Sequence, residues 1–442
     1  MKGDRTSLRN LILYEVYVRN HGPNGTFDDV TRDLPRIKNL GIDVVWLMPI
    51  HPIGKVNKKG GLGCPYSIQD YRKVNPEYGT LADFQNLLAI AHDIGLKVMI
   101  DVVYNHTSHD SVLVSEHPDF FHCDDNGRPV TTVPEWSDVI DLKYPNPVLE
   151  DYLIDTLCYW VDLGVDGFRC DVASIVPVEF WQKAKARVEA INPEVIWLAE
   201  SVELSWIVER REKGLVAQSD SELYSAFDIT YEYDIWHLFI NTIRRQSPVQ
   251  PYLEALHVQK GIYPKDFIKM RCVENHDNAR IMTSAPTQVS AMAWSAFQVF
   301  NQGAFLMYAG QESGAKHTPT LFDVDKIDWG NYPLESWYRQ LLSIKKDELF
   351  VYGHQHFIAA DPIVQVEWIY NENHILGFFN VNDLEGPCKC DLPDGEYYDL
   401  ITNQTIVITN REISMAQIPA IILKIPSNIS LNRLDSLWLG LI

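Results

Sequence analysis

Short apolar runs alternate with amphipathic segments from Leu11 to about Phe350. The apolar runs have the length and composition of buried strands, and the segments between them carry apolar residues at the spacing of one helix face. Eight strands are predicted, at residues 11–18, 42–48, 98–103, 165–170, 195–199, 225–229, 268–273 and 304–308. Helices are predicted at residues 27–40, 81–92, 149–163, 176–190, 235–243, 290–300 and 334–345. Repeated strand–helix alternation predicts a parallel sheet, and eight such units predict a (β/α)8 TIM barrel.

One connection in this series is much longer than the others. It runs from Val103 to the helix predicted at Leu149 and contains a turn signal, Asp-Asp-Asn-Gly-Arg-Pro, at residues 124–129. A loop of this length at the end of a barrel strand is expected to form a small unit with a function of its own. We therefore predict an inserted loop subdomain after strand three, at residues 105–144.

The chain changes character after Phe350 and becomes a series of short β-type runs separated by turns. The runs lie at residues 363–370, 375–381, 397–401, 405–408 and 420–425. They predict a C-terminal antiparallel β-sandwich domain at residues 351–430, followed by a tail at residues 431–442 that is either a helix or disordered. The barrel is then assigned to residues 1–104 and 145–350.

Composition and charge exclude several classes of function. The 442 residues include 59 acidic and 38 basic side chains, which gives a net charge of −21. A nucleic-acid partner is not expected, because phosphates require a basic surface. No run is long enough to span a membrane, and the N-terminus leads into no signal-peptide core, so no membrane association is expected. The seven cysteines, an odd number lying mostly in apolar surroundings, favour reduced thiols and a cytoplasmic protein.

Three acidic residues follow the C-terminal ends of predicted strands. Asp171 follows Gly-Phe-Arg-Cys, Glu200 follows Val-Ile-Trp-Leu-Ala, and Asp277 follows Asn-His. The C-terminal rim is where a parallel barrel places catalytic groups. Carboxylates brought together at one rim are suited to breaking a glycosidic bond, in which one group attacks and another donates a proton.

Each acid also has a structural explanation when it is considered alone. Arg169 lies two positions before Asp171, so both side chains are expected on one face of the strand. The guanidinium would then lower the pKa of Asp171 and keep it ionised. Alternatively, the two residues form a salt bridge with a purely structural role. Glu200 at the edge of an apolar run is expected to have a raised pKa suited to a general acid, or it is simply exposed. Asp277 could instead cap a helix.

The combination of motifs is far more specific than any one of them. Residues 101–106 (Asp-Val-Val-Tyr-Asn-His), 167–171 (Gly-Phe-Arg-Cys-Asp), Glu200 and 275–277 (Asn-His-Asp) occur in this order. The chain resembles the α-amylase family of retaining glycoside hydrolases and transglycosylases over roughly residues 11–350, because these segments are similar to its four catalytic motifs. Residues 65–71 are similar to the segment that carries the family's aromatic platform.

The resemblance implies a role for each matching residue. Asp171 would be the nucleophile, Glu200 the acid and then the base, and Asp277 would bind the 2- and 3-hydroxyls of the sugar in subsite −1. The remaining matches would bind or support the same sugar: Tyr66 would stack under it, Asp101 would support the site, His106 and His276 would hydrogen-bond the sugar, and Arg169 would orient and ionise Asp171.

The match becomes weaker directly after the nucleophile. Many family members have a Lys-His pair there, whose His provides a calcium ligand through its carbonyl, but this chain has Val-Ala-Ser-Ile at residues 172–175. Asn105 remains as a candidate calcium ligand, and the long loop contains Asp124, Asp125 and Asp138. The chemistry is expected to need no cofactor, and the binding of calcium is left open.

Three functions are compatible with these observations. The first is hydrolysis of α-1,4-linked glucans or maltodextrins, with an α-glucan oligosaccharide or polysaccharide as the partner. The second is transglycosylation or isomerisation through the same covalent intermediate, with a sugar hydroxyl in place of water. The third is an inactive barrel used for glycan binding or as a partner module, although all three acids are present.

Overall fold

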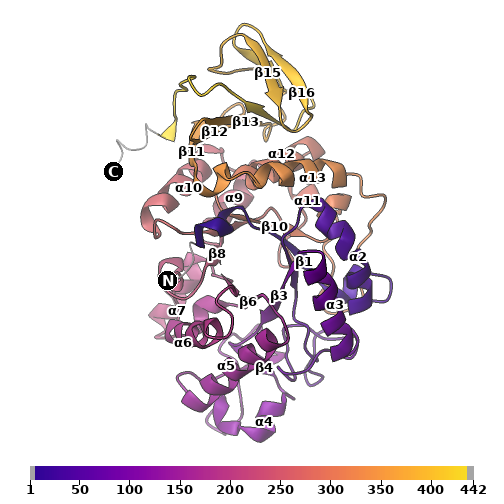
Figure 1. The fold of residues 1–442 in the computed structure, drawn as a ribbon. Coiled ribbons are helices and arrows are strands. Elements are labelled where there is room, and N and C mark those ends of the chain that lie inside the picture. The colour runs from indigo at the N-terminus through magenta and orange to yellow at the C-terminus, as the bar shows by residue number, and fades with distance from the viewer. Residues whose placement is uncertain (1–4, 436–442) are drawn as a thin grey trace.

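Eight parallel strands close into a barrel in the computed structural model, which describes residues 5–435 (Figure 1). Their order around the barrel is β1-β10-β9-β8-β7-β6-β3-β2. The strands are β1 (Ile12–Val16), β2 (Val44–Leu47), β3 (Lys97–Val102), β6 (Gly167–Cys170), β7 (Ile196–Ala199), β8 (Ile229–Tyr231), β9 (Lys269–Arg271) and β10 (Ala304–Tyr308). The predicted TIM barrel is confirmed.

One predicted strand is misplaced. The sequence analysis put a strand at residues 225–229, but β8 begins only at Ile229. Ser225, Ala226 and Phe227 form turn hydrogen bonds back to the short helix α8 (Asp220–Leu223) instead of pairing with neighbouring strands. The apolar residues that suggested a strand are buried, and Phe227 packs against Trp181 of α6 (Val178–Glu189) and Trp197 of β7.

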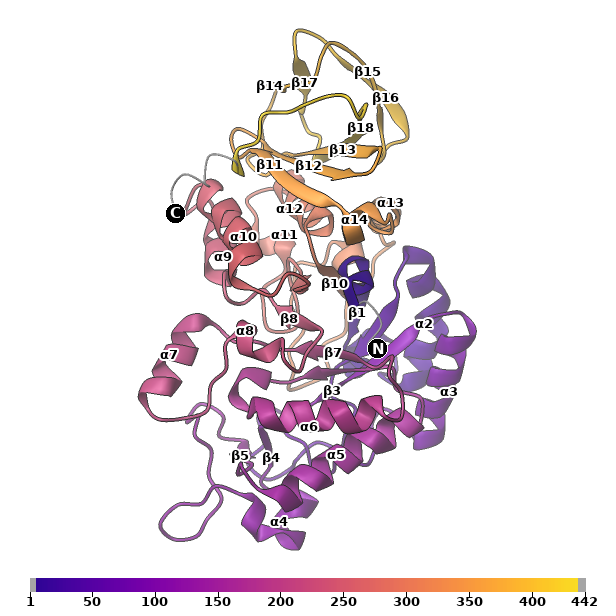
Figure 2. The same cartoon turned by 60° about the vertical axis from the view of Figure 1, so that its left-hand side comes forward.

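Helices surround the barrel and cover the outside of its strands (Figures 1 and 2). They are α1 (Val18–His21), α2 (Phe27–Leu40), α3 (Leu81–Asp93), α5 (Pro147–Asp162), α6 (Val178–Glu189), α7 (Leu204–Glu212), α8, α9 (Trp236–Ile243), α10 (Gln250–Ile262), α11 (Ile281–Ser284), α12 (Gln288–Phe300), α13 (Glu335–Lys345) and α14 (Leu349–Tyr352). The sequence analysis did not predict α7 and α10.

Local sequence explains the limits of α2. Thr26 and Asp29 form a reciprocal capping box at its start, and Gly41 ends it in the left-handed conformation with φ of 101°. Between them, Val30, Leu34 and Ile37 are fully buried at helical spacing. Burying each of these side chains stabilises the fold by about 1.5–3 kcal/mol, which anchors the helix to the barrel.

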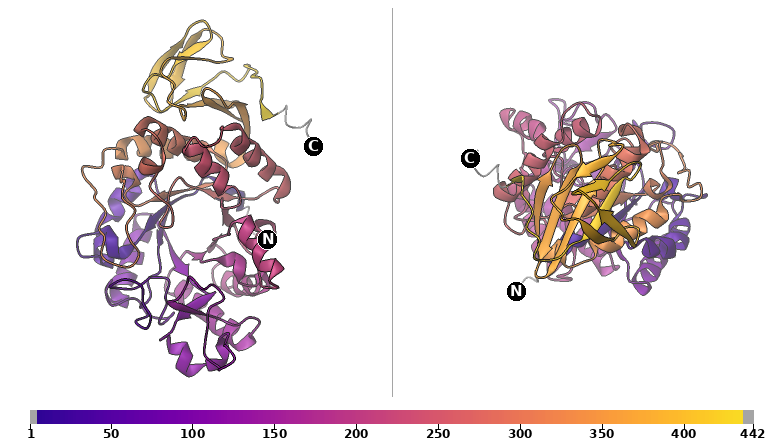
Figure 3. Two further views of the ribbon diagram at one scale, coloured as in Figure 1. Left: turned by 180° about the vertical axis from the view of Figure 1, so that it is seen from behind. Right: turned by 90° about the horizontal axis from the view of Figure 1, so that it is seen from above.

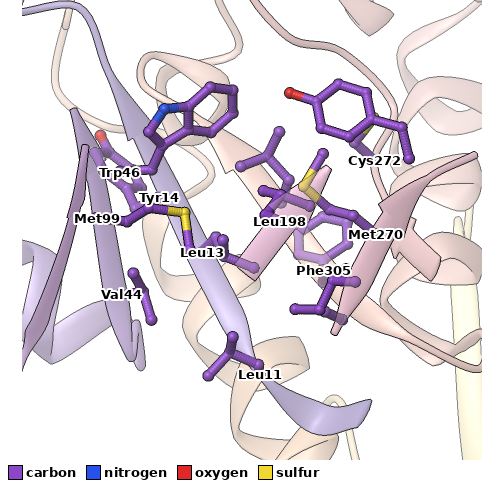
Figure 4. Close-up of a cluster of buried hydrophobic side chains, with 14 of the residues drawn as sticks. Leu11, Leu13, Tyr14, Val44, Trp46, Met99, Leu198, Met270, Cys272 and Phe305 are labelled. Carbon is purple, nitrogen blue, oxygen red and sulfur yellow. The ribbon is translucent and has the colours of Figure 1, made fainter. Parts of the chain in front are cut away.

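The barrel interior is filled by apolar side chains from strands far apart in the sequence (Figure 4). Leu13, Trp46, Met99, Leu198 and Met270 meet there and are fully or almost fully buried. This packed core fixes the strands, so the residues at their C-terminal ends are held on a rigid frame.

The long connection after β3 forms the predicted small unit beside the rim of the barrel (Figure 2). It contains β4 (His106–Ser108), α4 (Val112–Glu116) and β5 (Val139–Asp141), and β4 pairs antiparallel with β5. The register places His106 opposite Asp141. The pairing thereby joins the start of the long connection, directly after β3, to its end.

The C-terminal domain is antiparallel, as predicted, and packs against the helices α12 and α14 on the outside of the barrel (Figure 3). A six-stranded sheet has the order β11 (His354–Ala359), β12 (Val364–Tyr370), β13 (Asn373–Phe379), β18 (Ala420–Lys424), β15 (Gly395–Asp399) and β16 (Gln404–Ile408). A two-stranded sheet of β14 (Pro387–Lys389) and β17 (Glu412–Ser414) shares its core. Of the predicted tail at residues 431–442, the part from 436 onwards lies outside the described residues. Among residues 5–435, no helix has the length and apolar character needed to cross a membrane.

Candidate active site

A pocket of about 200 Å³ lies at the C-terminal ends of the barrel strands. Asp171 follows β6, Glu200 follows β7, and Asp277 lies shortly after β9. The pocket is lined by the three acids together with Lys59, Cys64, Tyr66, His106, Trp136, Asp138, Val139, Val172, His276, Leu321 and Phe322. Six of the eight sequence-predicted catalytic and sugar-binding residues thus line one pocket, and the other two, Asp101 and Arg169, are fully buried and bonded to members of this group.

A second and larger cavity, of about 740 Å³, lies between the barrel and the C-terminal domain. Its described lining is basic, with Arg9, Lys260 and Arg433, and includes a single carboxylate, Asp435. One carboxylate does not provide the acid pair that glycosidic chemistry requires. The smaller pocket is therefore the candidate active site.

Arg169 is the hub of the candidate active site. Its Nη1 donates to Asp171 Oδ1 at 2.8 Å and to Asp101 Oδ1 at 3.0 Å, and its Nη2 lies 3.0 Å from Glu200 Oε2. The contact to Glu200 lacks hydrogen-bond geometry, so it is an ion-pair contact only. The side chain is fully buried, and its Nε donates to the hydroxyl of Tyr231 at 3.1 Å. One guanidinium is therefore shared by three carboxylates.

Burial raises the pKa values of these carboxyl groups, and the one shared cation does not offset it. Burial raises the pKa of Asp171 to about 7, and Arg169 lowers it only in part because Asp101 and Asp277 act in the opposite direction. Burial likewise raises the pKa of Glu200 to about 7, with Arg169 again lowering it. The expected low pKa of Asp171 is wrong, since one cation does not offset burial and two further carboxylates. The expected raised pKa of Glu200 agrees in direction.

Val172 holds Glu200 through its backbone. Its N–H donates to Glu200 Oε2 at 2.6 Å, and the residue has φ of 36° and ψ of 45°, in the left-handed region. A β-branched residue rarely adopts this conformation, which costs about 1–3 kcal/mol. The first residue after Asp171, where the sequence departs from the common family pattern, therefore orients the Glu200 carboxylate.

His276 is held as a cation between two acids. Its Nδ1 donates to Glu15 Oε1, and its Nε2 lies 3.1 Å from Asp277 Oδ2. Burial alone would lower the pKa of His276, but Asp277 and Glu15 outweigh it and raise this pKa well above its usual value. Burial would raise the pKa of Asp277, and His276 lowers it instead. Asp277 therefore stays ionised, and its side chain, 44% exposed, reaches into the open pocket.

Tyr66 connects this pair to the Arg169 hub. Its ring stacks on His276 with 5.4 Å between centroids and an interplanar angle of 16°. Its hydroxyl donates to Asp101 Oδ2 at 3.0 Å and lies 2.8 Å from His276 Nε2, whose proton it accepts. Because Asp101 is also bonded to Arg169, the two halves of the site form one hydrogen-bonded network.

His106 is neutral and points towards Asp171. Burial lowers its pKa to about 4, and its Nε2 lies 4.0 Å from Asp171 Oδ2. The amide of Asn105 donates to His106 Nδ1 at 3.1 Å, which leaves the ring proton on Nε2. A neutral N–H beside Asp171 is suited to donating a hydrogen bond to a sugar hydroxyl.

The candidate calcium ligands do not converge. The side-chain amide of Asn105 is hydrogen-bonded to His106. The backbone carbonyl of Asn105 accepts a hydrogen bond from the Leu142 N–H at 2.9 Å. Asp138 pairs with Lys59, while Asp124 accepts from backbone N–H groups of its own turn. Within residues 5–435, no group of three or more His, Cys, Asp or Glu side chains is placed to hold a metal ion. No step of the chemistry is therefore assigned to calcium.

The sequence analysis assigned no site role to Glu15, nor to the pocket-lining residues Lys59, Cys64, Trp136, Val139, Val172, Leu321 and Phe322. Glu15 carried a usable signal, because it is the single acid within the apolar run at residues 11–18, which was predicted to be a buried strand. Lys59 and Trp136 lie in loops without periodicity, so only the tertiary structure places them.

Comparison with known proteins agrees with this geometry. The sequence matches the family model "Alpha amylase, catalytic domain" over residues 4–127 and 134–348. The chain belongs to the α-amylase family. Residues 357–422 match "Bacterial Alpha amylase C-terminal domain", so the family assignment covers both the barrel and the C-terminal sheet.

Individual members of the α-amylase family are similar over different lengths. A crystal structure of an α-amylase from Lactobacillus plantarum is 41% identical, with a TM-score of 0.90 over 95% of this chain and 100% of that chain. A noncanonic maltogenic α-amylase, AmyB, from Thermotoga neapolitana is 31% identical, with a TM-score of 0.83 over 95% and 99% of the two chains.

Sequence relatives are more distant. Alpha-amylase 3 of Dictyoglomus thermophilum is 26% identical over 69% of this chain and 64% of its own length. An α-1,4-glucan:maltose-1-phosphate maltosyltransferase of Cereibacter sphaeroides is 31% identical over 49% of this chain and 41% of its own length. The chain thus spans less than two thirds of these curated relatives.

Proposed function

We propose that the protein is a retaining glycoside hydrolase that cleaves α-1,4-linked glucans or maltodextrins. The observation that carries this proposal is the sharing of Arg169 by Asp171 and Glu200, both buried in the pocket with pKa values raised to about 7. Two carboxyl groups that titrate near neutral pH and are held by one cation provide one ionised and one protonated group at once.

In the first half of the reaction, the Asp171 carboxylate attacks C1 of the sugar. The bond between C1 and the leaving oxygen breaks, and Glu200 gives its proton to that oxygen. The product is a β-glycosyl ester of Asp171. In the second half, the Glu200 carboxylate takes a proton from water, whose oxygen attacks C1 and releases the Asp171 carboxylate. Both groups return to their starting states.

The other groups bind the sugar and take no part in the proton transfers. The exposed carboxylate of Asp277 is placed to accept from sugar hydroxyls, and the cationic His276 beside it keeps it ionised. His106 presents its Nε2 proton near Asp171. The face of Tyr66 offers an apolar surface to the C–H groups of the ring. Hydrogen bonds that strengthen as the ring distorts lower the barrier.

The test is incubation with maltoheptaose, with released sugars separated by chromatography and the anomeric configuration of the first product followed by NMR. We expect shorter maltodextrins with the α-configuration retained. Asp171→Asn and Glu200→Gln should abolish release with the circular dichroism spectrum unchanged. An initial β-anomer, or full activity in either variant, would exclude this mechanism.

Transglycosylation is the second candidate. Val172, Val202 and Ile207 form an apolar cluster on the Glu200 side of the pocket, against which Trp136 and Trp206 pack. The two tryptophan rings contact each other with centroids 5.9 Å apart. Such a surface favours a sugar acceptor over water, and the relatives named as maltosyltransferases support this alternative. Products longer than maltoheptaose in the same incubation would establish it.

An inactive glycan-binding or partner module is the third candidate. The pocket contains all three acids, both histidines and the platform tyrosine, which argues against it. If no α-glucan is cleaved while Asp171→Asn binds maltoheptaose as the unsubstituted protein does, this third function should be adopted.

A cytoplasmic location and an uncharged or weakly charged glucan partner complete the proposal. All seven cysteines are unpaired, which is typical of a reducing compartment. The net charge of −21 disfavours nucleic acids. Cell fractionation with an antibody against the chain tests the location.

A further inference from the structure

The loop after β2 folds back on itself as a hairpin that borders the catalytic pocket. Ile53 and Ile68 pair antiparallel at its base, and the Gly54 N–H donates to the Ser67 carbonyl at 2.8 Å. The hairpin provides Tyr66, the proposed sugar platform, and its tip provides Lys59. The platform and the tip therefore belong to the same hairpin.

The tip of this hairpin is fastened to the loop after β10. The Gly61 N–H donates to Asp323 Oδ1 at 2.8 Å, and the Leu62 N–H donates to the Phe322 carbonyl at 2.9 Å. Gly60 has φ of +63°, and a Cβ there would lie 2.5 Å from the Cβ of Phe322. The two loops are thus in direct contact, and Leu321 and Phe322 line the pocket beside them.

Lys59 fastens the same hairpin to the long loop after β3. Its Nζ lies 2.9 Å from Asp138 Oδ1 and donates to the Glu135 carbonyl at 3.0 Å. Ser67 adds a hydrogen bond from its Oγ to the Asp138 carbonyl at 2.9 Å. The Asp138 side chain is only 4% exposed, so loss of its counter-charge would leave a buried unpaired carboxylate.

These contacts join three loops beside the pocket, and the barrel order places two of them, the hairpin and the Phe322 loop, opposite the acid. In the closed order of eight strands, β7 lies four positions from β1 in either direction. Glu200 follows β7, whereas the hairpin and the Phe322 loop follow β2 and β10, the two neighbours of β1. Since Glu200 must face the leaving group, the hairpin and the Phe322 loop stand on the other side of the bond that breaks, where the glycosyl donor lies, and Lys59 at the hairpin tip fastens them to the loop after β3.

We propose that Lys59 closes the donor end of the catalytic pocket, so that the enzyme cleaves α-glucans from their non-reducing chain ends. This inference rests on the proposed function and specifies its substrate. In an α-1,4-glucan, C1 of the cleaved residue faces the leaving group and its O4 faces away. A closed wall on that side leaves no path for a chain that continues through O4.

The size of the pocket supports this inference. Its volume of about 200 Å³ is below the range of about 300–1,000 Å³ that holds drug-sized ligands. A cleft that binds a glucan in mid-chain must be open at both ends and hold several rings. A pocket of this size accommodates a short chain end instead.

The experiment compares two p-nitrophenyl α-maltoheptaosides, one free and one with the O4 and O6 of its non-reducing end blocked by an ethylidene group. Cleavage is followed by chromatography of both substrates, so that each bond broken is identified. We expect the blocked substrate to be cleaved at least about 100-fold more slowly, because the blocked end does not fit against the wall.

Lys59→Ala is expected to raise the relative rate on the blocked substrate by at least about tenfold, because it opens the wall. Lys58→Ala is the matched control, since Lys58 donates to the Gly61 carbonyl of its own loop and is not among the residues that line the pocket. If Lys59→Ala unfolds because Asp138 is left unpaired, the double variant with Asp138→Asn removes that charge and should show the same gain.

The outcomes separate this inference from the function on which it rests. Equal rates on the two substrates would overturn the closed donor end while leaving glycoside hydrolysis intact. Slow cleavage of the blocked substrate in all variants would overturn the role of Lys59. If neither substrate is cleaved, the proposed function fails, and the inference fails with it.

Discussion

Glu15 Oε1 accepts a hydrogen bond from Nδ1 of His276, and both side chains are buried at the C-terminal rim of the barrel. His276 is one of the residues that the family resemblance implies for sugar binding, whereas Glu15 lies on β1, in a segment that matches no catalytic motif. The contact fixes the orientation of the ring and keeps His276 protonated beside Asp277. Glu15 therefore positions His276 without lining the pocket itself.

Replacement of Glu15 by Gln should weaken catalysis in a pH-dependent manner. Hydrogen bonds to charged groups contribute about 1.5–3 kcal/mol, so we expect kcat/KM on maltodextrins to fall by roughly 10–100-fold. A group whose pKa is raised by a partner loses its proton as pH rises, and without Glu15 the pKa of His276 should move down. The deficit should therefore grow from pH 6 to pH 9. A variant with a constant deficit at every pH would show that Glu15 only packs.

Replacement of Glu200 by Gln should separate the two halves of the reaction. Loss of the general acid is expected to slow the cleavage of maltodextrins by about 10²–10⁴-fold. A fluoride leaving group needs no proton, so α-maltosyl fluoride should still react with Asp171, and the ester should accumulate because its hydrolysis lacks a base. Mass spectrometry should find a maltosyl group on the peptide that contains Asp171. The double variant with Asp171→Asn is the control and should remain unlabelled.

The pH profile of kcat/KM should be bell-shaped with its maximum near neutral pH. The pKa values of Asp171 and Glu200 are both raised to about 7, and the two groups share Arg169. Below this region Asp171 becomes protonated and loses its nucleophilicity, and above it Glu200 loses the proton it must donate. Measurement between pH 4 and pH 10 tests this. A profile that stays flat down to pH 4 would contradict the raised pKa of Asp171.

Replacement of Asp171 by Asn should stabilise the fold at alkaline pH. A carboxyl whose pKa is raised in the folded state binds more protons there than in the unfolded chain, so its contribution to stability falls as pH rises from about 4 towards 7. Asn carries no charge and avoids this loss. At pH 8 we expect the free energy of unfolding to rise by about 1 kcal/mol or more, and Tm to rise with it. Near pH 4 the variant and the unsubstituted protein should have the same stability. Calorimetry at the two pH values tests this, and a lower Tm at pH 8 would contradict it.

Removal of calcium should leave activity unchanged within about twofold, because the candidate ligands already have protein partners. Asn105 is bonded to His106 and to the Leu142 N–H, and Asp138 pairs with Lys59. The measurement is activity after dialysis against EDTA, with added CaCl2 as the control. Loss of activity that calcium alone restores would show that a calcium site exists.

The order of strands and helices follows from the sequence, because hydrophobic periodicity is a local property. The helix at residues 27–40 and the strand at residues 304–308 have the predicted limits. The prediction of a strand at residues 225–229 is wrong, because this segment is a buried turn whose apolar side chains resemble those of a strand. Periodicity identifies burial, and it does not distinguish a strand from a buried turn of the same length.

The sequence by itself determined which acids stand at strand ends, and the motif order determined the family and the reaction class. Only the tertiary structure decided how these groups are charged and what surrounds them. Asp101 and Arg169 are 68 positions apart, and Glu15 and His276 are 261 positions apart, yet each pair is in hydrogen-bond contact. Ionisation depends on burial and on the summed charge of all neighbours, so the pKa of Asp171 rises although Arg169 lies beside it. These effects depend on distances in space and not on separation along the chain, and the folded barrel brings the interacting groups together.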